Sequence, residues 1–300
     1  MPSKIEWVKN PDGTEGETWN PITGCTPISA GCVHCYAKRM SKRLAGRFGY
    51  PENGYHCPTC DLNYHLLGGE HCPQCGGMAT ETSSFDVTFH EDKLRQPLKW
   101  KKPRRIFVCS MGDLFHIDVR PQWLEDIFAV IKKCPQHTFQ ILTKRPGKMK
   151  TWFEWYGSIP ENVQLGTTPE NQAMADLRIP ILLQIPAAVR FVSIEPMLGP
   201  VDPWAWLDKC DHCFGNNPCV HFGDCINYSG GHHSSADLDW VIVGAETGPG
   251  ARTMDLNWAR DIRNQCAAAG VPFFFKKDSQ GRHTLDGRTW EQFPEVSDAK

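Results

Sequence analysis

The sequence predicts an α/β fold, a full or partial (β/α) barrel of parallel strands with helices between them. Short apolar runs recur without alternation, as in strands buried on both faces of a parallel sheet. Each run ends in a polar or glycine-containing tip, and helix-like segments of crossover length separate the runs. The runs are IFVC from residue 106, FQIL from 139, VQLG from 163, RFVSI from 190, WVIV from 240 and FFF from 273.

A further short strand is expected at residues 18–21, which gives six or seven βα units. Function in such a barrel lies at the carboxyl ends of the strands, where the polar tips fall. An open doubly wound sheet is the alternative, and it would place ligands in a crevice at the same strand ends.

Three segments have the spacing of helices. Residues 121–133 begin with Pro121, which suits a first helical turn, and residues 255–269 have a capping Asp255 and an exit at Gly270. Residues 36–48 combine an apolar stripe with a basic side that would either face phosphates or be solvated. The stripe is Tyr36, Met40, Leu44 and Phe48, and the basic side is Lys38, Arg39, Lys42, Arg43 and Arg47.

Composition narrows the class of protein. The net charge of −2 gives no global footprint for nucleic acid or an acidic partner, although local basic patches remain possible. No apolar run is long enough to span a bilayer, and the N-terminus has no signal-peptide core. We therefore expect no membrane partner and a cytoplasmic protein, in the host cytoplasm if it is phage-encoded. Fourteen cysteines in such a chain, mostly clustered, indicate metal sites rather than disulfides.

The densest cysteine cluster follows the first predicted strand. Cys25, Cys32 and Cys35 lie in one short loop directly before a predicted helix. Four thiolates would close a zinc site, whereas three leave one corner of a metal, or one iron of a cluster, open to a ligand that is not protein. We expect the chemistry at this open position.

Two further cysteine-rich stretches read as insertions into the barrel. The first, residues 51–84, contains two CxxC knuckles typical of a structural zinc ribbon: Cys57, Cys60, Cys72 and Cys75. The second, residues 204–235, would hold zinc or a second cluster on Cys210, Cys213, Cys219 and Cys225, with His212, His221, His232 or His233 as possible substitutes. Residues 1–50 then hold the first strand, cluster loop and first helix, and residues 85–203 and 236–300 hold the rest of the barrel.

Basic residues also occur at the predicted strand tips and before the second predicted strand. Positive charge at the mouth of the barrel would suit a substrate with phosphate groups. The tip residues are Lys144, Arg145, Arg252, Lys276 and Lys277. The stretch KWKKPRR, residues 99–105, could contact a nucleic acid backbone or be solvated.

At the level of motifs, the chain resembles the radical S-adenosylmethionine enzymes. The strings WNPITGC, GCVHCYA, SMGDLFH, ILTKRP, LGTTPEN, SIEPMLGP and VGAETGPGAR are similar to a phage-associated subfamily that also occurs in bacteria. The likeness runs from about residue 18 to 278. Six residues separate the first two cysteines, where the commonest triplet of the superfamily has three, and the longer loop is found in the subfamily.

The resemblance implies a barrel of the radical S-adenosylmethionine type and two cofactors besides zinc. Cys25, Cys32 and Cys35 would hold a 4Fe-4S cluster, and its fourth iron would be chelated by the amino and carboxylate groups of S-adenosylmethionine. The side chains implied to contact S-adenosylmethionine are Ser110, Gly112, Asp113, Thr167, Glu170, Asn171 and Glu195. Each of these could instead be a helix cap or turn former at a strand end.

The function implied is an enzyme that reductively cleaves S-adenosylmethionine to a 5′-deoxyadenosyl radical, which then abstracts hydrogen from the substrate. We expect a nucleotide or DNA substrate, as in phage-type thymidine hypermodification by an isomerase, lyase or transferase. The electron would come from a one-electron reductant such as flavodoxin or ferredoxin.

Other functions remain open. Within the same class the substrate could be a damaged base, as in photoproduct lyases, or a peptide. A different class is a non-catalytic, zinc-stabilised nucleic-acid-binding module. A third is metal-assisted hydrolysis by Glu195, Glu246, Asp113 and His116.

Overall fold

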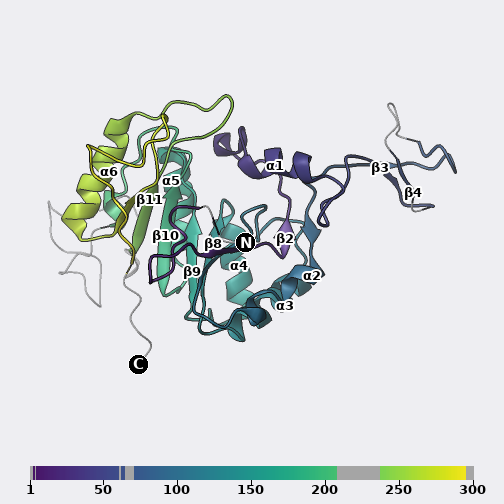
Figure 1. Cartoon of the computed structure of the whole chain (residues 1–300), viewed down its shortest axis with the longest axis horizontal. Helices are drawn as coiled ribbons and strands as arrows, with labels where there is room; N and C mark the ends of the chain where they lie inside the picture. Colours follow the sequence, from purple (N-terminus) through teal and green to yellow (C-terminus); the bar gives the residue numbers. More distant parts are fainter. Residues whose placement is uncertain (1–2, 4, 61, 65–70, 208–236, 295–300) are drawn as a thin grey trace.

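The computed structural model describes residues 3, 5–60, 62–64, 71–207 and 237–294. Its main sheet has seven parallel strands in the order β1-β7-β8-β9-β10-β11-β12 (Figure 1). The strands are β1 (Glu17–Trp19), β7 (Arg105–Val108), β8 (Thr138–Thr143), β9 (Val163–Thr167), β10 (Val189–Ile194), β11 (Trp240–Val243) and β12 (Phe273–Phe275). Every strand predicted for the main sheet is confirmed, with ends that shift by a residue or two.

The sheet curls into a half-barrel. Within the described residues β1 and β12 remain its two edges, so the partial barrel is confirmed and the closed barrel is not. Strand order follows the chain without reversal. The doubly wound alternative is therefore wrong, because that fold needs a point where the strand order reverses.

Four helices cover the outer face of the sheet (Figure 1). They are α3 (Pro121–Lys132), α4 (Pro146–Tyr156), α5 (Gln172–Leu183) and α6 (Leu256–Ala269). Successive strand residues alternate between the faces, so Ile106 and Val108 pack in the main core while Phe107 belongs to a separate cluster. Asp255 caps α6 by accepting from the N–H of Asn257 at 2.8 Å, as predicted.

The second cluster fills the concave face of the sheet with aromatic rings. Trp7, from the segment before β1, is buried, and its ring centroid lies 4.9 Å from that of Phe107 and 5.8 Å from those of Phe191 and Trp240. The sequence gave no sign of this contact, because the surrounding N-terminal residues are polar. The N-terminal segment thus completes the interior that an open sheet would leave exposed.

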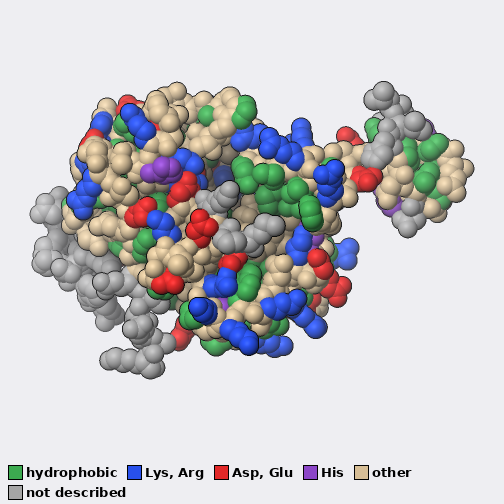
Figure 2. Space-filling model, in the orientation of Figure 1, with side chains coloured by type: hydrophobic (Ala, Val, Ile, Leu, Met, Phe, Trp, Pro, Cys, Tyr) green, Lys and Arg blue, Asp and Glu red, His purple; other side chains and the backbone are tan. Residues whose placement is uncertain are grey.

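A long excursion separates β1 from β7. Its elements are β2 (Ile22–Thr23), the 3-10 turn Ala30–Cys32, α1 (Tyr36–Leu44), β3 (Gly54–Cys57), β4 (Leu62–Tyr64), β5 (Thr80–Thr82), β6 (Thr88–Phe89), α2 (Glu91–Leu94) and the 3-10 turn Pro97–Lys99. Antiparallel pairing of β2 with β6 closes the base of the excursion. The small sheet β4-β3-β5 forms a lobe that stands away from the body (Figure 1 and Figure 2). One more 3-10 turn, Trp204–Trp206, follows β10.

The buried face of α1 differs from the predicted stripe. Tyr36 and Phe48 are 58% and 75% exposed, whereas Ala37 and Ser41 are buried. The Ser41 hydroxyl lies 3.3 Å from that of Ser84, and Ala37 packs in one cluster with Phe85. The helix therefore turns its small residues to the chain that returns from the lobe, because only small side chains allow so close an approach.

The described part of the chain contains no helix that is both long and apolar enough to cross a membrane. The second predicted cysteine-rich site lies outside the described residues, with Cys210, Cys213, Cys219 and Cys225 and the four histidines near them.

Candidate functional site

A cavity of about 280 Å³ opens at the carboxyl ends of the strands, beneath the cysteine loop. The thiols of Cys25, Cys32 and Cys35 all line it, so the fold places them over the strand tips. The tip residues on its wall are Ser110, Gly112, Asp113, Thr143, Lys144, Arg145, Thr168, Glu195, Ala245 and Glu246. The ten described cysteines are all free of disulfides, and these three are half-buried.

Two glycines bring the start of the loop against the tip of β7. The N–H of Gly24 donates to the carbonyl of Met111 at 2.9 Å, and Gly24 forms an isolated parallel bridge with Gly112. A Cβ on Gly112 would lie 2.8 Å from the Gly24 carbonyl oxygen. A side chain at either position would separate the two backbones, so this contact fixes where Cys25 enters the cavity.

Arg145, directly after β8, holds the first cysteine. Its guanidinium donates to Cys25 Sγ at 3.4 Å, to the Thr26 carbonyl at 3.0 Å and to Asp113 Oδ2 at 3.3 Å. Burial, with the charge of Asp113, raises the pKa of the Cys25 thiol to about 11 although Arg145 opposes the shift. The thiol therefore stays protonated at neutral pH unless a cation binds it, since bound metal ions deprotonate coordinating thiols outright.

A buried ion pair holds the middle of the loop. Glu170, after β9, accepts from the N–H of Gly31 at 3.2 Å and from Arg178 at 2.6 Å, and both charged side chains are almost completely buried. Burial alone would raise the pKa of Glu170, but hydrogen bonding to Ser29 and the charge of Arg178 outweigh it, so the pKa is lowered. The carboxylate stays ionised beneath the loop.

A third anchor comes from the tip of β11. Glu246 accepts from the backbone N–H and Nε of Arg252, each at 2.8 Å, and lies 2.9 Å from His34 Nδ1. Arg252 in turn donates to the Ala30 carbonyl at 2.9 Å. The hydrogen bonds from Arg252 outweigh burial and lower the pKa of Glu246 to about 2. Three strand tips therefore position the cysteine loop through side chains.

Most of the predicted basic mouth is neutralised. Lys276 pairs with Glu195 at 2.5 Å, and Lys277 pairs with Glu6 at 2.9 Å. Arg145 and Arg252 are bound as described above. Lys144 lines the cavity and has no ion-pair partner among the described residues. It is therefore the tip cation available to an anionic ligand.

The side chains implied to contact S-adenosylmethionine divide into two sets. Four of them border the cavity: Ser110, Gly112, Asp113 and Glu195. Thr167, Glu170 and Asn171 lie behind its wall instead. Thr167 donates to the Thr143 carbonyl at 2.8 Å, and Asn171 caps α5 by accepting from the Met174 N–H at 3.1 Å. These side chains organise the strand ends that surround the cavity.

Asp113 also has a structural part. Its Oδ1 accepts from the Thr143 hydroxyl at 2.7 Å and from the Phe115 N–H at 3.0 Å. With Arg145 on its other oxygen, this carboxylate ties the tip of β7 to the tip of β8. Ser110 likewise donates to Asn20 Oδ1 at 3.1 Å.

The sequence reasoning missed several loop contacts. Thr26 accepts or donates a hydrogen bond with His116 Nε2 at 2.7 Å, and His34 lies against Glu246. Cys109, predicted to be a small core residue, is buried as expected, yet it also borders the floor of the cavity. No spacing in the sequence distinguishes these residues, because their partners are remote along the chain.

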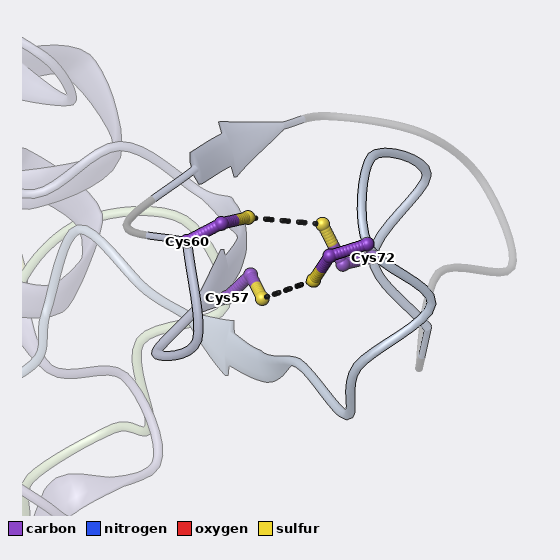
Figure 3. Close-up of side chains that lie close together, drawn as sticks. Cys57, Cys60 and Cys72 are labelled. Atoms are coloured by element: carbon purple, nitrogen blue, oxygen red, sulfur yellow. Dashed lines mark hydrogen bonds between the residues drawn. The ribbon is translucent and has the colours of Figure 1, made fainter.

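The lobe brings four thiols together. Cys57, Cys60, Cys72 and Cys75 form a group whose ligand atoms all lie within 4.8 Å of one another, so it could hold a metal ion such as zinc. Two sulfur pairs, Cys57 with Cys75 and Cys60 with Cys72, are each 3.5 Å apart (Figure 3 labels three of these residues).

The environment of the four thiols favours a thiolate at one of them. Burial would raise the pKa of Cys57, but hydrogen bonds from the N–H groups of Cys60 and Thr59 lower it to about 6. Burial and a hydrogen bond with Cys72 raise the pKa of Cys60 to about 12. A divalent cation would offset this opposition, because it stabilises all four thiolates at once.

The hydrolytic alternative finds no single-ion site. Among the described residues, the four lobe cysteines are the group of three or more His, Cys, Asp or Glu side chains with this spacing. Glu195, Glu246 and Asp113 each bind a basic side chain, and His116 binds Thr26. These four residues are therefore occupied as partners of the loop and tips.

Fold and site together define an α/β protein with a parallel half-barrel, a cavity bordered by a three-cysteine loop, and a separate four-cysteine group. The chain belongs to the family described as a protein of unknown function, DUF5131, whose model matches residues 2–294. No curated protein and no solved structure matches it.

This family membership corrects one expectation from the sequence. The assignment to the radical S-adenosylmethionine superfamily, and to its phage-associated subfamily, is wrong, because the family match over nearly the whole chain is DUF5131 and no radical S-adenosylmethionine family is found. The likeness rested on short strings at strand tips. Such tips recur wherever parallel strands end above a site, so they reflect shared geometry as much as shared family.

Proposed function

We propose that this protein is an enzyme in which Cys25, Cys32 and Cys35 bind a 4Fe-4S cluster with one open iron, and that S-adenosylmethionine binds there for reductive cleavage. The observation that carries the proposal is the convergence of three free thiols from one loop on a cavity above the strand ends. The proposal concerns chemistry at this site and claims no superfamily membership.

The donor set fits a cluster with an open corner. Iron–sulfur clusters are held by cysteine thiolates, and three thiolates leave one iron for another ligand. Cys109 borders the same cavity, but burial raises the pKa of its thiol to about 12 although a hydrogen bond with the Ile22 backbone opposes this. It is therefore the poorest candidate for a fourth thiolate.

The chain's own residues would bind, orient and shield the ligand. The Lys144 ammonium is available to the carboxylate of S-adenosylmethionine, and Phe85, Phe107 and Leu142 supply an apolar wall that excludes water. Arg145, Glu170 and Arg252 hold the loop so that the thiols keep their positions. When bound and reduced, a cluster of this kind supplies one electron to a sulfonium, which yields a 5′-deoxyadenosyl radical for hydrogen abstraction.

The setting follows from this chemistry. Thiols and clusters need a reducing compartment, so we place the protein in the cytoplasm, with flavodoxin or ferredoxin as the class of electron donor. The substrate we favour is a nucleotide or a DNA base, to be rearranged or modified. A damaged base, as in photoproduct lyases, is the second substrate.

The test is iron and sulfide analysis after anaerobic reconstitution, with electron paramagnetic resonance of the reduced protein with and without S-adenosylmethionine. We expect about four irons in the cavity site per chain, a spectrum that changes when S-adenosylmethionine is added, and formation of 5′-deoxyadenosine. Cys32→Ala should lose the cluster. Cys266→Ala, which alters a buried thiol in α6, should keep it. A full cluster in Cys32→Ala would overturn the ligand assignment.

A non-catalytic, zinc-stabilised nucleic-acid-binding module is the other candidate. The four thiols of the lobe, within 4.8 Å of one another, favour it. It predicts zinc but no iron in anaerobically purified protein, so the same metal analysis separates the two functions.

A further inference from the structure

The exposed side of α1 is a basic surface without counter-charges. Lys38, Lys42 and Arg43 are exposed, as is Arg47 just beyond the helix, and α1 contains no acidic residue. None of the four has an ion-pair partner among the described residues. Figure 2 shows Lys and Arg side chains gathered over this helix. Unneutralised cations on one face form an electrostatic footprint for a polyanion.

The same surface carries an aromatic ring at the mouth of the cavity. Tyr36, the first residue of α1, lines the cavity and is 58% exposed. Phe48, 75% exposed, lies at the other end of the basic side. Exposed aromatic rings between cations are the arrangement by which proteins bind single-stranded nucleic acid, with phosphates on the cations and bases stacked on the rings.

The basic surface is fixed relative to the cavity. Arg39, on the same helix, crosses the opening and donates to the Thr247 carbonyl at 3.1 Å, and Thr247 also lines the cavity. A Cβ on Gly248 would lie 2.3 Å from the Arg39 guanidinium, so only glycine leaves room for this contact. A ligand held along α1 is therefore held at a constant position beside the cavity.

We propose that α1 is the binding surface for single-stranded nucleic acid, with the backbone along Lys38, Lys42, Arg43 and Arg47 and one base stacked on Tyr36 at the mouth of the cavity. The substrate of the cavity is then a base within a strand. This assignment of substrate rests on the proposed function, whereas binding along α1 does not. An acidic protein is the other polyanion that could lie here, but it gives no reason for an exposed tyrosine at the entrance.

A second basic stretch provides a matched comparison. Lys99 and Lys101 are exposed and lie just before β7, hence at the amino ends of the strands and opposite the cavity. They offer the same number of cations as Lys42 and Arg43, without access to Tyr36. Loss of charge there should not affect binding beside the cavity.

The experiment measures fluorescence anisotropy of a labelled, mixed-sequence 20-nucleotide single-stranded DNA, titrated with the full chain over a range of salt concentrations. Lys42→Gln/Arg43→Gln should weaken binding about tenfold or more and reduce the slope of log affinity against log salt by about 2, because each lost phosphate contact removes about 1. Lys99→Gln/Lys101→Gln should change affinity less than twofold. Tyr36→Ala should weaken binding about tenfold at an unchanged salt slope, and Tyr36→Phe should restore it.

Two outcomes would overturn the proposal: equal weakening by both lysine pairs, or no binding of DNA together with α1-dependent binding of a flavodoxin. The measurement is repeated with Cys32→Ala. Binding by that variant shows that the surface works without the cluster, so a failure of the proposed function and a failure of this inference are distinguishable.

Discussion

The carboxylate of Glu170 accepts a hydrogen bond at 3.2 Å from the backbone N–H of Gly31, 139 positions earlier in the chain. Gly31 stands between Cys25 and Cys32, so a residue at the end of β9 decides where the cysteine loop lies. Glu170 is itself fixed by Arg178, which projects from α5. The loop is thus positioned by the sheet and its helices rather than by its own sequence.

Glu170→Gln should destabilise the protein by about 3–5 kcal/mol, because it leaves the Arg178 guanidinium buried without a counter-charge. Urea unfolding at neutral pH measures the change. Glu154→Gln, which breaks the exposed pair between Lys150 and Glu154 on α4, should cost no more than about 0.5 kcal/mol. Equal losses in the two variants would show that the buried pair does not hold the loop.

The carboxylate of Glu246 should give the protein a specific sensitivity to acid. Its pKa lies near 2 in the folded protein against an ordinary value of 4.5, so its contribution is complete above about pH 4.5 and is lost as the pH falls toward 2. Between pH 6 and pH 4 the native protein should lose roughly 0.5–1 kcal/mol more of its unfolding free energy than Glu246→Gln. Unfolding curves at the two pH values measure this, and parallel losses would contradict it.

Gly24→Ala should disturb the cysteine loop far more than another glycine with the same backbone requirement. Gly24 has φ +88°, and an added Cβ would lie 2.1 Å from the Asp86 carbonyl oxygen, whereas Gly13 has φ +80° and open space around it. Gly13→Ala should therefore cost about 1–2 kcal/mol for the left-handed backbone alone. Gly24→Ala adds about 1–3 kcal/mol of crowding and should lower the iron content after reconstitution. Equal costs would show that the loop shifts freely.

Lys144→Met should weaken binding of S-adenosylmethionine about tenfold or more while the cluster remains, because a charged hydrogen bond to the carboxylate is lost. Equilibrium dialysis with the reconstituted protein measures the affinity, and the iron content provides the internal check. Lys148→Met, at an exposed position of α4, is the matched control and should bind normally. An unchanged affinity in Lys144→Met would leave the ammonium without a part in ligand binding.

Removal of metal from the lobe should unfold the lobe and leave the sheet intact. The lobe's thiols and tyrosines form a hydrophobic cluster of their own, separate from the core of the half-barrel. A Cys60→Ser/Cys72→Ser variant should bind no zinc, and limited proteolysis should then cut between β3 and β5 while strands β7 to β12 stay protected. Cys134→Ser, in the buried core, should keep its zinc. Cleavage throughout the sheet would contradict the independence of the lobe.

Much of the fold could be predicted because its signals are local. A run such as residues 240–243 is apolar throughout, which suits a strand covered on both faces, and Asp255 and Gly270 mark the two ends of α6 through short-range capping. The stripe on α1 was placed wrongly, since the residues that the helix buries depend on a segment that returns from the lobe forty residues later.

The candidate site divides in the same way. Cysteine spacing alone identified the three thiols of the loop and the four of the lobe, because ligands of one centre must be held by short, turning segments. No spacing could show that Glu170, Arg252 and Arg145 anchor the loop, or that Lys276 is paired with Glu195 while Lys144 is free.

The sequence by itself determined the parallel strands, their order of appearance, and the cysteines that could bind metal, since periodicity and ligand spacing act over a few residues. Only the tertiary structure decided that the sheet stays an open half-barrel with Trp7 in its hollow, and that three strand tips hold the cysteine loop over a cavity. These contacts join residues far apart in the chain. Their energies depend on burial and charge pairing, which exist only once the chain has folded.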